Sequence, residues 1–194
     1  MLILASRSAS RQAMLQAAGV PFMPVPADLD ERGIGAALEP LGPAAVALEL
    51  ARAKAGAVAS RNAGRVVLGS DSLVVCDGRR FDKPGSREEA AEHLAWFSGR
   101  TMELHSGAAL VRDDAVLFEV ADVARLRVRA LSPAFITHYL DEEWPDVGQC
   151  VGVFRIEGPG VNLFESIEGS HFTVLGMPLL PVLGALREAG VMPR

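Results

Sequence analysis

Residues 66–76 read Val66-Val67-Leu68-Gly69-Ser70-Asp71-Ser72-Leu73-Val74-Val75-Cys76, an apolar run with a polar centre. The apolar residues on each side are typical of buried strands, and we predict two strands separated by a turn at residues 69–72. A carboxylate seldom lies within a buried run without a partner, because removing its charge from water is costly. Asp71 is therefore a candidate for holding a divalent cation or activating water, with an ordinary turn aspartate as the alternative.

Strands and helices alternate on both sides of this stretch. Further strands are predicted at residues 2–5, 22–25, 103–111, 115–129 and 150–156. A helix is predicted from an N-cap at Ser6 or Ser8 to Ala18, with others at residues 44–60, 86–97, 132–143 and 178–189. A polar loop is expected to begin at residues 30–32. This order predicts an α/β fold with a mixed sheet flanked by helices, and a single domain over residues 1–194.

Composition excludes several classes of protein. Of the 194 residues, 49% are hydrophobic and 22% are charged, which excludes a disordered or fibrous chain. A net charge of -5 argues against binding to a nucleic-acid polymer, although a local basic pocket could still hold a small anion. Cys76 and Cys150 are too few for a disulfide framework.

No segment of the sequence looks like a signal peptide or a membrane span. The apolar start of the chain is short and has no basic region before it. The longest uncharged stretch, residues 172–186, is shorter than a membrane helix and contains two prolines. We therefore expect a protein of the cytoplasm that does not associate with membranes.

The segment Ser6-Arg7-Ser8-Ala9-Ser10-Arg11 lies where a predicted strand passes into a helix. Hydroxyls, backbone N–H groups and guanidinium groups meet there beside the positive end of a helix dipole, an arrangement suited to phosphate. The alternative is an N-cap with two solvated arginines.

Lysine is rare in this chain, because only Lys54 and Lys83 occur among 19 basic residues. A retained lysine offers a compact ammonium that contacts phosphate as a point charge, and chance is the alternative. Pro84 holds Lys83 in an extended conformation. Among the acids, Glu31 begins a polar segment and Glu157 precedes a Gly-Pro-Gly turn. A basic phosphate site with an isolated carboxylate indicates metal-assisted phosphoryl chemistry.

These segments, in this order, resemble the Maf family of nucleoside triphosphate pyrophosphatases. The resemblance spans nearly the whole chain. It rests on residues 4–11 (LASRSASR), 30–31 (DE), 50–55 (LARAKA), 69–72 (GSDS), 83–84 (KP), 98–100 (SGR), 156–158 (IEG) and 174–179 (VLGMPL).

The resemblance implies an elongated, two-lobed Maf/ITPase-like fold with a central cleft. It implies cleavage of nucleoside triphosphates between the α and β phosphates, with a divalent cation, usually Mg²⁺, as cofactor. By position, Asp71 would activate water and share the metal with Glu31. The residues that would hold the triphosphate are Ser8, Arg11, Lys54 and Lys83.

Substrate preference in the family tracks three positions, occupied here by Ser10, Ser72 and Glu157. The dTTP/UTP type carries Arg, Thr and Gln there, and the 7-methyl-GTP type carries Trp, Gln and Glu. Glu157 matches the second type, and a carboxylate can accept hydrogen bonds from the N1–H and amine of guanine. The first motif departs from the family, with Ala9 for the usual proline and Ser10 or Gln12 for one of two arginines.

Several interpretations of the function stay open. Within the same chemistry, a dTTP/UTP pyrophosphatase or an ITP/XTP pyrophosphatase competes with a 7-methyl-GTP enzyme. A nucleotide-binding regulator of cell division with little turnover is the alternative from another class. The resemblance also suggests a homodimer, for which no sequence patch gives independent support.

Overall fold

The computed structural model describes residues 1–193, apart from the side chains of Arg32 and Glu39. Its sheet contains β1 (Leu2–Leu4), β2 (Phe22–Pro24), β3 (Val66–Cys76), β4 (Arg79–Phe81), β5 (Thr101–Arg112), β6 (Ala115–Val128) and β7 (Phe164–Glu168). The strand order is β2-β1-β3-β5-β6-β7, with β4 paired to β3. Pairing is parallel between β1 and both β2 and β3, and antiparallel for β3–β4 and β6–β7. The predicted mixed α/β sheet is confirmed.

The α-helices within residues 1–193 are α1 (Ala9–Ala17), α2 (Glu31–Leu38), α3 (Pro43–Ala59), α4 (Arg87–Phe97), α5 (Pro133–Glu143), α6 (His171–Val174) and α7 (Leu179–Glu188). Five of these seven α-helices correspond to predicted helices, and α2 and α6 were not predicted. Short 3₁₀ helices lie at Glu39–Leu41, Asp146–Gln149 and Pro159–Leu163. Ser8, Ser86 and Ser132 each accept a hydrogen bond from the backbone N–H three residues later, which satisfies a donor that the helix itself leaves free.

Two predictions near the candidate site are wrong. Residues 69–72 do not break the strand, because β3 runs unbroken from Val66 to Cys76 and Asp71 finds a buried cationic partner within it. Residues 31–38 form α2 instead of a loop. Asp30 Oδ1 accepts a hydrogen bond from the backbone N–H of Gly33 at 3.0 Å, so the acid caps the helix that follows.

The predicted strand at residues 150–156 is also wrong. This segment forms turns, and Val153 has a φ of 55° that a regular strand does not allow. Val153 and Phe154 are nonetheless buried, and Tyr139 donates a hydrogen bond to the carbonyl of Val153. Apolar residues therefore mark a buried turn here, while the strand β7 that follows was not predicted.

The chain divides into two compact units. The first contains Met1–Ser72, His105–Val123 and Ser170–Arg194, of which residue 194 lies outside the described residues. The second contains Leu73–Leu104 and Ala124–Gly169. In the second unit, Phe81, His93 and Phe97 pack as an aromatic cluster. No helix within residues 1–193 combines the length and the apolar character that spanning a membrane requires.

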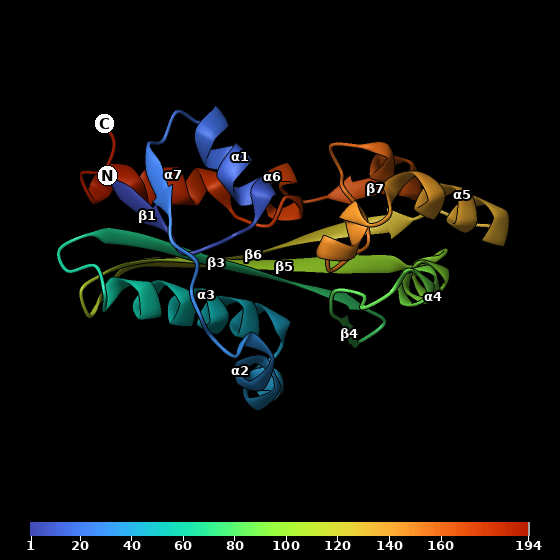
Figure 1. Cartoon of the computed structure of the whole chain (residues 1–194), viewed down its shortest axis with the longest axis horizontal. Coiled ribbons are helices and arrows are strands. Elements are labelled where there is room, and N and C mark those ends of the chain that lie inside the picture. Colours follow the sequence, from blue (N-terminus) through green and yellow to red (C-terminus); the bar gives the residue numbers. More distant parts are fainter. Residues whose placement is uncertain (194) are drawn as a thin grey trace. The chain divides into compact units, whose positions relative to one another are not determined.

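In the first unit, helices cover both faces of the sheet. Figure 1 shows α3 along one face, with α1 and α7 on the other. Alternation along β1 explains this arrangement, because Leu2 and Leu4 pack in the cluster that contains α1 and α7, whereas Ile3 packs with Ala55 of α3. All of these side chains are almost completely buried.

Helix α3 lies unusually close to the strands beneath it. A Cβ at Gly69 of β3 would lie 2.1 Å from the carbonyl oxygen of Ala51 and 2.7 Å from the backbone nitrogen of Ala55. A Cβ at Gly107 of β5 would lie 2.6 Å from the carbonyl oxygen of Ala47. The two glycines therefore let the helix backbone rest directly on the sheet, and this approach fixes where side chains of α3 meet β3.

We predict that Gly69→Ala destabilises the fold by more than about 3 kcal/mol, because the added methyl group collides with helix backbone that cannot rotate away. Denaturant unfolding followed by circular dichroism would measure the change. Gly56→Ala is the matched control, since a Cβ at Gly56 of the same helix meets nothing within 4 Å. That control should raise stability by about 1 kcal/mol. Equal effects of the two substitutions would contradict the close-approach explanation.

Candidate functional site

The close approach of α3 to β3 brings a lysine into contact with two carboxylates. Lys54 Nζ of α3 lies 2.5 Å from Asp71 Oδ1 of β3 and 2.9 Å from Glu31 Oε2 of α2. The Lys54 and Asp71 side chains are only 8% and 11% exposed, while Glu31 is 48% exposed. One ammonium thus neutralises a buried acid and a solvent-facing acid, which explains how Asp71 remains within a buried strand.

Arg11 is the second buried cation of the first unit. Its Nε donates to the carbonyl of Gly176 at 2.8 Å, its Nη2 to Ser72 Oγ at 2.9 Å and its Nη1 to Ser6 Oγ at 3.3 Å. Burial lowers the pKa of the guanidinium, while the negative charges of Asp71 and Glu31 act in the opposite direction. A buried cation bound to uncharged oxygens retains its attraction for an anion.

The start of α1 is built as the sequence indicates. Ser8 is the N-cap, and its Oγ accepts the backbone N–H of Arg11 at 3.4 Å. The helix therefore begins with its free N–H groups beside the Arg11 guanidinium. Ser10 lies in the first turn and is partly buried.

The structure brings together Ser8, Arg11, Glu31, Lys54, Asp71 and Ser72, all of which belong to the first unit. The other two candidates, Lys83 and Glu157, belong to the second unit, where both are exposed. Both influence the thiol of Cys150: burial raises its pKa, the charge of Glu157 raises it further and the charge of Lys83 lowers it. The two residues therefore lie near a common point of the second unit.

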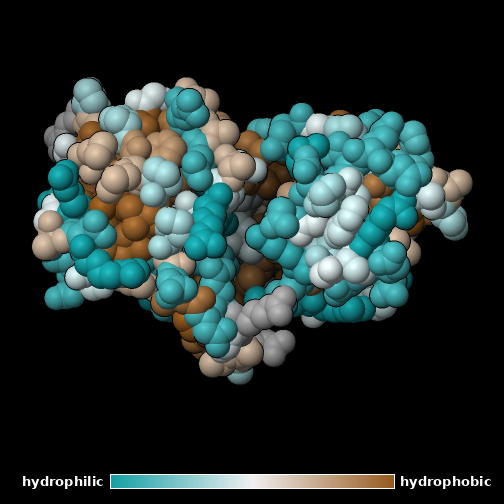
Figure 2. Space-filling model, viewed as in Figure 1, coloured by the Kyte–Doolittle hydropathy of each residue, from teal (hydrophilic) through white to brown (hydrophobic). Residues whose placement is uncertain are grey.

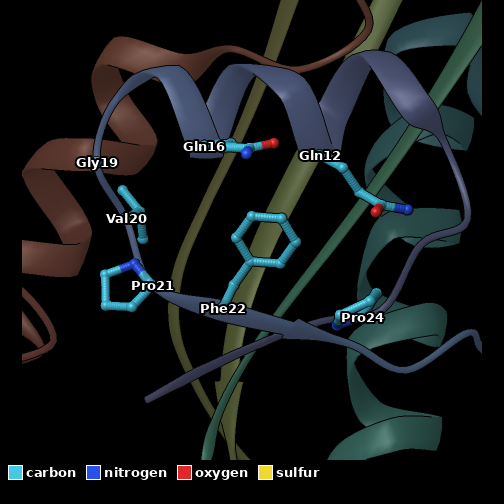
Figure 3. A pocket seen from close by; sticks show the side chains of 7 residues that line it. All are labelled: Gln12, Gln16, Gly19, Val20, Pro21, Phe22 and Pro24. Atoms are coloured by element: carbon cyan, nitrogen blue, oxygen red, sulfur yellow. The ribbon is translucent and has the colours of Figure 1, made fainter.

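A surface hollow of about 480 Å³ lies elsewhere in the first unit. Figure 3 shows its lining, which comes from one face of α1 and from the segment leading into β2: Gln12, Gln16, Gly19, Val20, Pro21, Phe22 and Pro24. Figure 2 shows apolar surface near β1 and β2, where Met23 is 41% exposed. Because no charged residue lines the hollow, it does not suit a triphosphate. Gln12 lines this hollow, whereas its neighbour Arg11 is buried and does not line it.

Two carboxylates of the first unit, Glu31 and Asp71, are candidates for holding a metal ion. The described residues contain no cluster of three or more His, Cys, Asp or Glu side chains suited to a metal ion. Glu31 and Asp71 nevertheless share one cation, Lys54 Nζ. Mg²⁺ is commonly bound by one or two carboxylates together with water and substrate phosphates, so this pair fits such an ion.

Sequence reasoning missed the buried hydroxyls and the carbonyl that surround Arg11. Ser70 Oγ lies 2.8 Å from the carbonyl of Gly107 and 3.1 Å from that of Gly176, and Ser106 donates to the carbonyl of Thr173 at 3.0 Å. Serines within apolar strands were the available signal, since a buried hydroxyl needs a partner. These partners lie 37 to 106 residues away along the chain, which no local pattern reveals.

Comparisons with known proteins agree with this chain over almost all of its length. The family model described as Maf-like protein matches residues 1–189. A protein of Nitrobacter hamburgensis is 47% identical over 191 residues, covering 98% of this chain and 95% of its own. A protein of Rhodopseudomonas palustris is 46% identical over 187 residues, covering 96% and 93%. A protein of Sphingopyxis alaskensis is 44% identical over 196 residues, covering 100% and 99%. Each is named nucleoside triphosphate pyrophosphatase.

Among solved structures, a HAM1 protein from Coxiella burnetii superposes with a TM-score of 0.42 at 19% identity, covering 66% of this chain and 72% of that one. The match to the family model spans residues 1–189 and so includes α1, β3, α7 and the residues around Lys54 and Arg11. The chain therefore belongs to the Maf family.

Proposed function

We propose that this chain hydrolyses nucleoside triphosphates between the α and β phosphates, giving a nucleoside monophosphate and pyrophosphate. One observation carries the proposal. The buried carboxylate of Asp71 forms an ion pair with Lys54 near the buried Arg11, whose hydrogen bonds go to uncharged oxygens. The names of the relatives support the same chemistry. In this reaction a water oxygen attacks the α-phosphorus, the bond to the bridging oxygen breaks, and pyrophosphate leaves.

Each side chain has a distinct part in the proposed reaction. Asp71 orients the attacking water and takes its proton, because an acceptor-only carboxylate is the base available at this point. Arg11, with Ser8 and the start of α1, binds phosphate oxygens and stabilises the charge that develops in the transition state. Lys54 adds a second positive charge. We assign Lys83 of the second unit to phosphate binding as well.

The site's own charges explain why a divalent cation is part of the proposal. Two cations, Arg11 and Lys54, face two carboxylates, Asp71 and Glu31, so the four groups sum to zero. A triphosphate carries several negative charges that these groups leave uncompensated. We propose that Glu31 and Asp71 hold a divalent cation, Mg²⁺ in the first instance; when bound, it supplies charge neutralisation and activation of water.

The finer parts of the proposal rest on the family resemblance. We propose 7-methyl-GTP or a related purine nucleotide as substrate, with Glu157 facing the base and Ser10 and Ser72 at the other positions that track preference. We further propose that the two units work as one Maf-like domain, and that the protein acts in the cytoplasm as a homodimer without a nucleic-acid partner.

Asp71→Asn should lower pyrophosphate release by roughly 10²–10⁴-fold, because an amide cannot accept the proton from water. Nucleotide binding should persist. Release from purified protein with Mg²⁺ and binding by calorimetry would measure both. Asp113→Asn, in the exposed turn between β5 and β6, is the matched control and should behave as wild type. A wild-type protein that binds nucleotides without turnover would instead favour the regulator of cell division.

Lys54→Met should bind Mg²⁺ more tightly than wild type in the absence of nucleotide, by about tenfold, because the ammonium no longer competes for Glu31 and Asp71. Calorimetric titration with Mg²⁺ would measure this. Glu31→Gln should weaken Mg²⁺ binding in the same assay. If neither substitution altered Mg²⁺ affinity, this carboxylate pair would not be the metal site.

Glu157→Gln should shift preference from 7-methyl-GTP and GTP toward dTTP and UTP by roughly tenfold in kcat/KM ratio, because an amide loses an acceptor for guanine and gains a donor for a pyrimidine carbonyl. A panel of 7-methyl-GTP, GTP, dTTP, UTP, CTP, ITP and XTP would test this. Glu165→Gln, an exposed neighbour paired with Arg127, is the control. A wild-type preference for dTTP or UTP would refute the purine assignment of Glu157, and a preference for ITP or XTP would keep a purine but refute the contact with the guanine amine.

A further inference from the structure

The hydroxyl of Ser72 has three polar neighbours within the first unit. Its Oγ lies 2.9 Å from Arg11 Nη2, 3.0 Å from the carbonyl of Gly176 and 2.9 Å from Ser106 Oγ. A serine hydroxyl has one proton, and Ser106 gives its own proton to the carbonyl of Thr173. Ser72 therefore accepts from Arg11, and its single proton goes to the carbonyl of Gly176 or to Ser106 Oγ. It can donate that proton to a nucleobase only by giving up the bond it already makes.

The carbonyl of Gly176 is the common anchor of this arrangement. It accepts from Arg11 Nε, and both Ser70 Oγ and Ser72 Oγ lie within 3.1 Å of it. Gly176 has a φ of 101°, which side-chain-bearing residues rarely adopt. A Cβ there would lie 3.1 Å from Ser72 Oγ and 3.6 Å from Arg11 Nε. The glycine thus brings one backbone oxygen against both the arginine and the serine.

These bonds leave part of the guanidinium for a ligand. Arg11 has five N–H donors, and three of them are used by Gly176, Ser72 and Ser6. The fixed bonds to Nε and Nη2 hold the plane of the group, so its remaining donors keep one direction. A planar donor pair of fixed direction suits the oxygens of a phosphate.

We propose that Ser72 and the carbonyl of Gly176 are positioning groups for Arg11, so that Ser72 governs binding of the phosphate chain whichever base the nucleotide carries. This inference rests on the proposed function.

The experiment measures binding of inorganic triphosphate by calorimetry and kcat and KM for the nucleotide panel. Ser72→Ala should weaken triphosphate binding about tenfold and raise KM by a similar factor for every base, with the order of preference unchanged. Ser72→Thr keeps the hydroxyl and should stay within about threefold of wild type. Ser106→Ala removes a buried hydroxyl that contacts Ser72 but not Arg11, and should therefore weaken triphosphate binding less than Ser72→Ala does.

A double-mutant cycle separates positioning from direct contact. In an Arg11→Ala background, Ser72→Ala should change triphosphate binding by less than about twofold, because its partner is already absent. Ser72→Cys, of similar size but with a weak acceptor, replaces Ser72→Ala if the latter does not fold. The proposal is overturned if Ser72→Ala reorders base preference while triphosphate binding is unchanged, or if its effect is equal in both backgrounds.

The two proposals fail in different ways. If wild type released no pyrophosphate from any nucleotide, yet Ser72 and Arg11 remained coupled in triphosphate binding, the proposed function would fall and the positioning role would stand. If wild type hydrolysed nucleotides but did not bind inorganic triphosphate, or bound it without this coupling, the positioning role would be wrong and the proposed function would be unaffected.

Discussion

The direct contact between the backbone of α3 and the strands β3 and β5 is the constraint on which the candidate site depends. Gly69 and Gly107 carry no Cβ, so the helix rests on the sheet at a separation that a methyl group would prevent. At that separation Lys54 reaches Asp71, and a carboxylate in the middle of a buried strand becomes stable. With a larger residue at 69 the helix would lift away, and Asp71 would be a buried charge without a partner.

In the first unit, the helices on the two faces of the sheet therefore contribute different groups to the candidate site. The α3 face supplies the lysine, and α2 adds a second carboxylate at its first residue. The opposite face carries α1 and α7, and the segment between α6 and α7 supplies the Gly176 carbonyl that holds Arg11. Both cations end near residues 70–72 of β3, because a single continuous strand contacts helices on both of its faces.

More of the buried polar side chains in this region form hydrogen bonds to backbone carbonyls than form ion pairs. Ser70, Ser72 and Ser106 bind carbonyl oxygens of distant segments, and Arg11 binds one of the same oxygens. Neutral partners satisfy hydrogen-bonding needs without cancelling charge, so the arginine remains attractive to an anion. Lys54 is different, since two carboxylates already compensate it. Arg11 thus has no directly paired carboxylate, whereas Lys54 holds the two acids in place.

The sequence by itself determined the mixed α/β class and the starts of α4 and α5 at their serine caps, because caps and apolar runs act over a few residues. For α1 it left Ser6 and Ser8 as alternative caps, and the structure has Ser8. It did not determine that β3 is continuous, since Asp71 is stable within a buried strand only because Lys54, 17 residues earlier, reaches it. It also did not determine that a helix follows Asp30. Nor could it place Gly176 against Arg11, because that bond joins residues 165 positions apart. Only the packed tertiary structure decides which hydrogen-bond or ionic partner each buried polar group has. These pairings bring charged residues that are distant in the sequence together in one site.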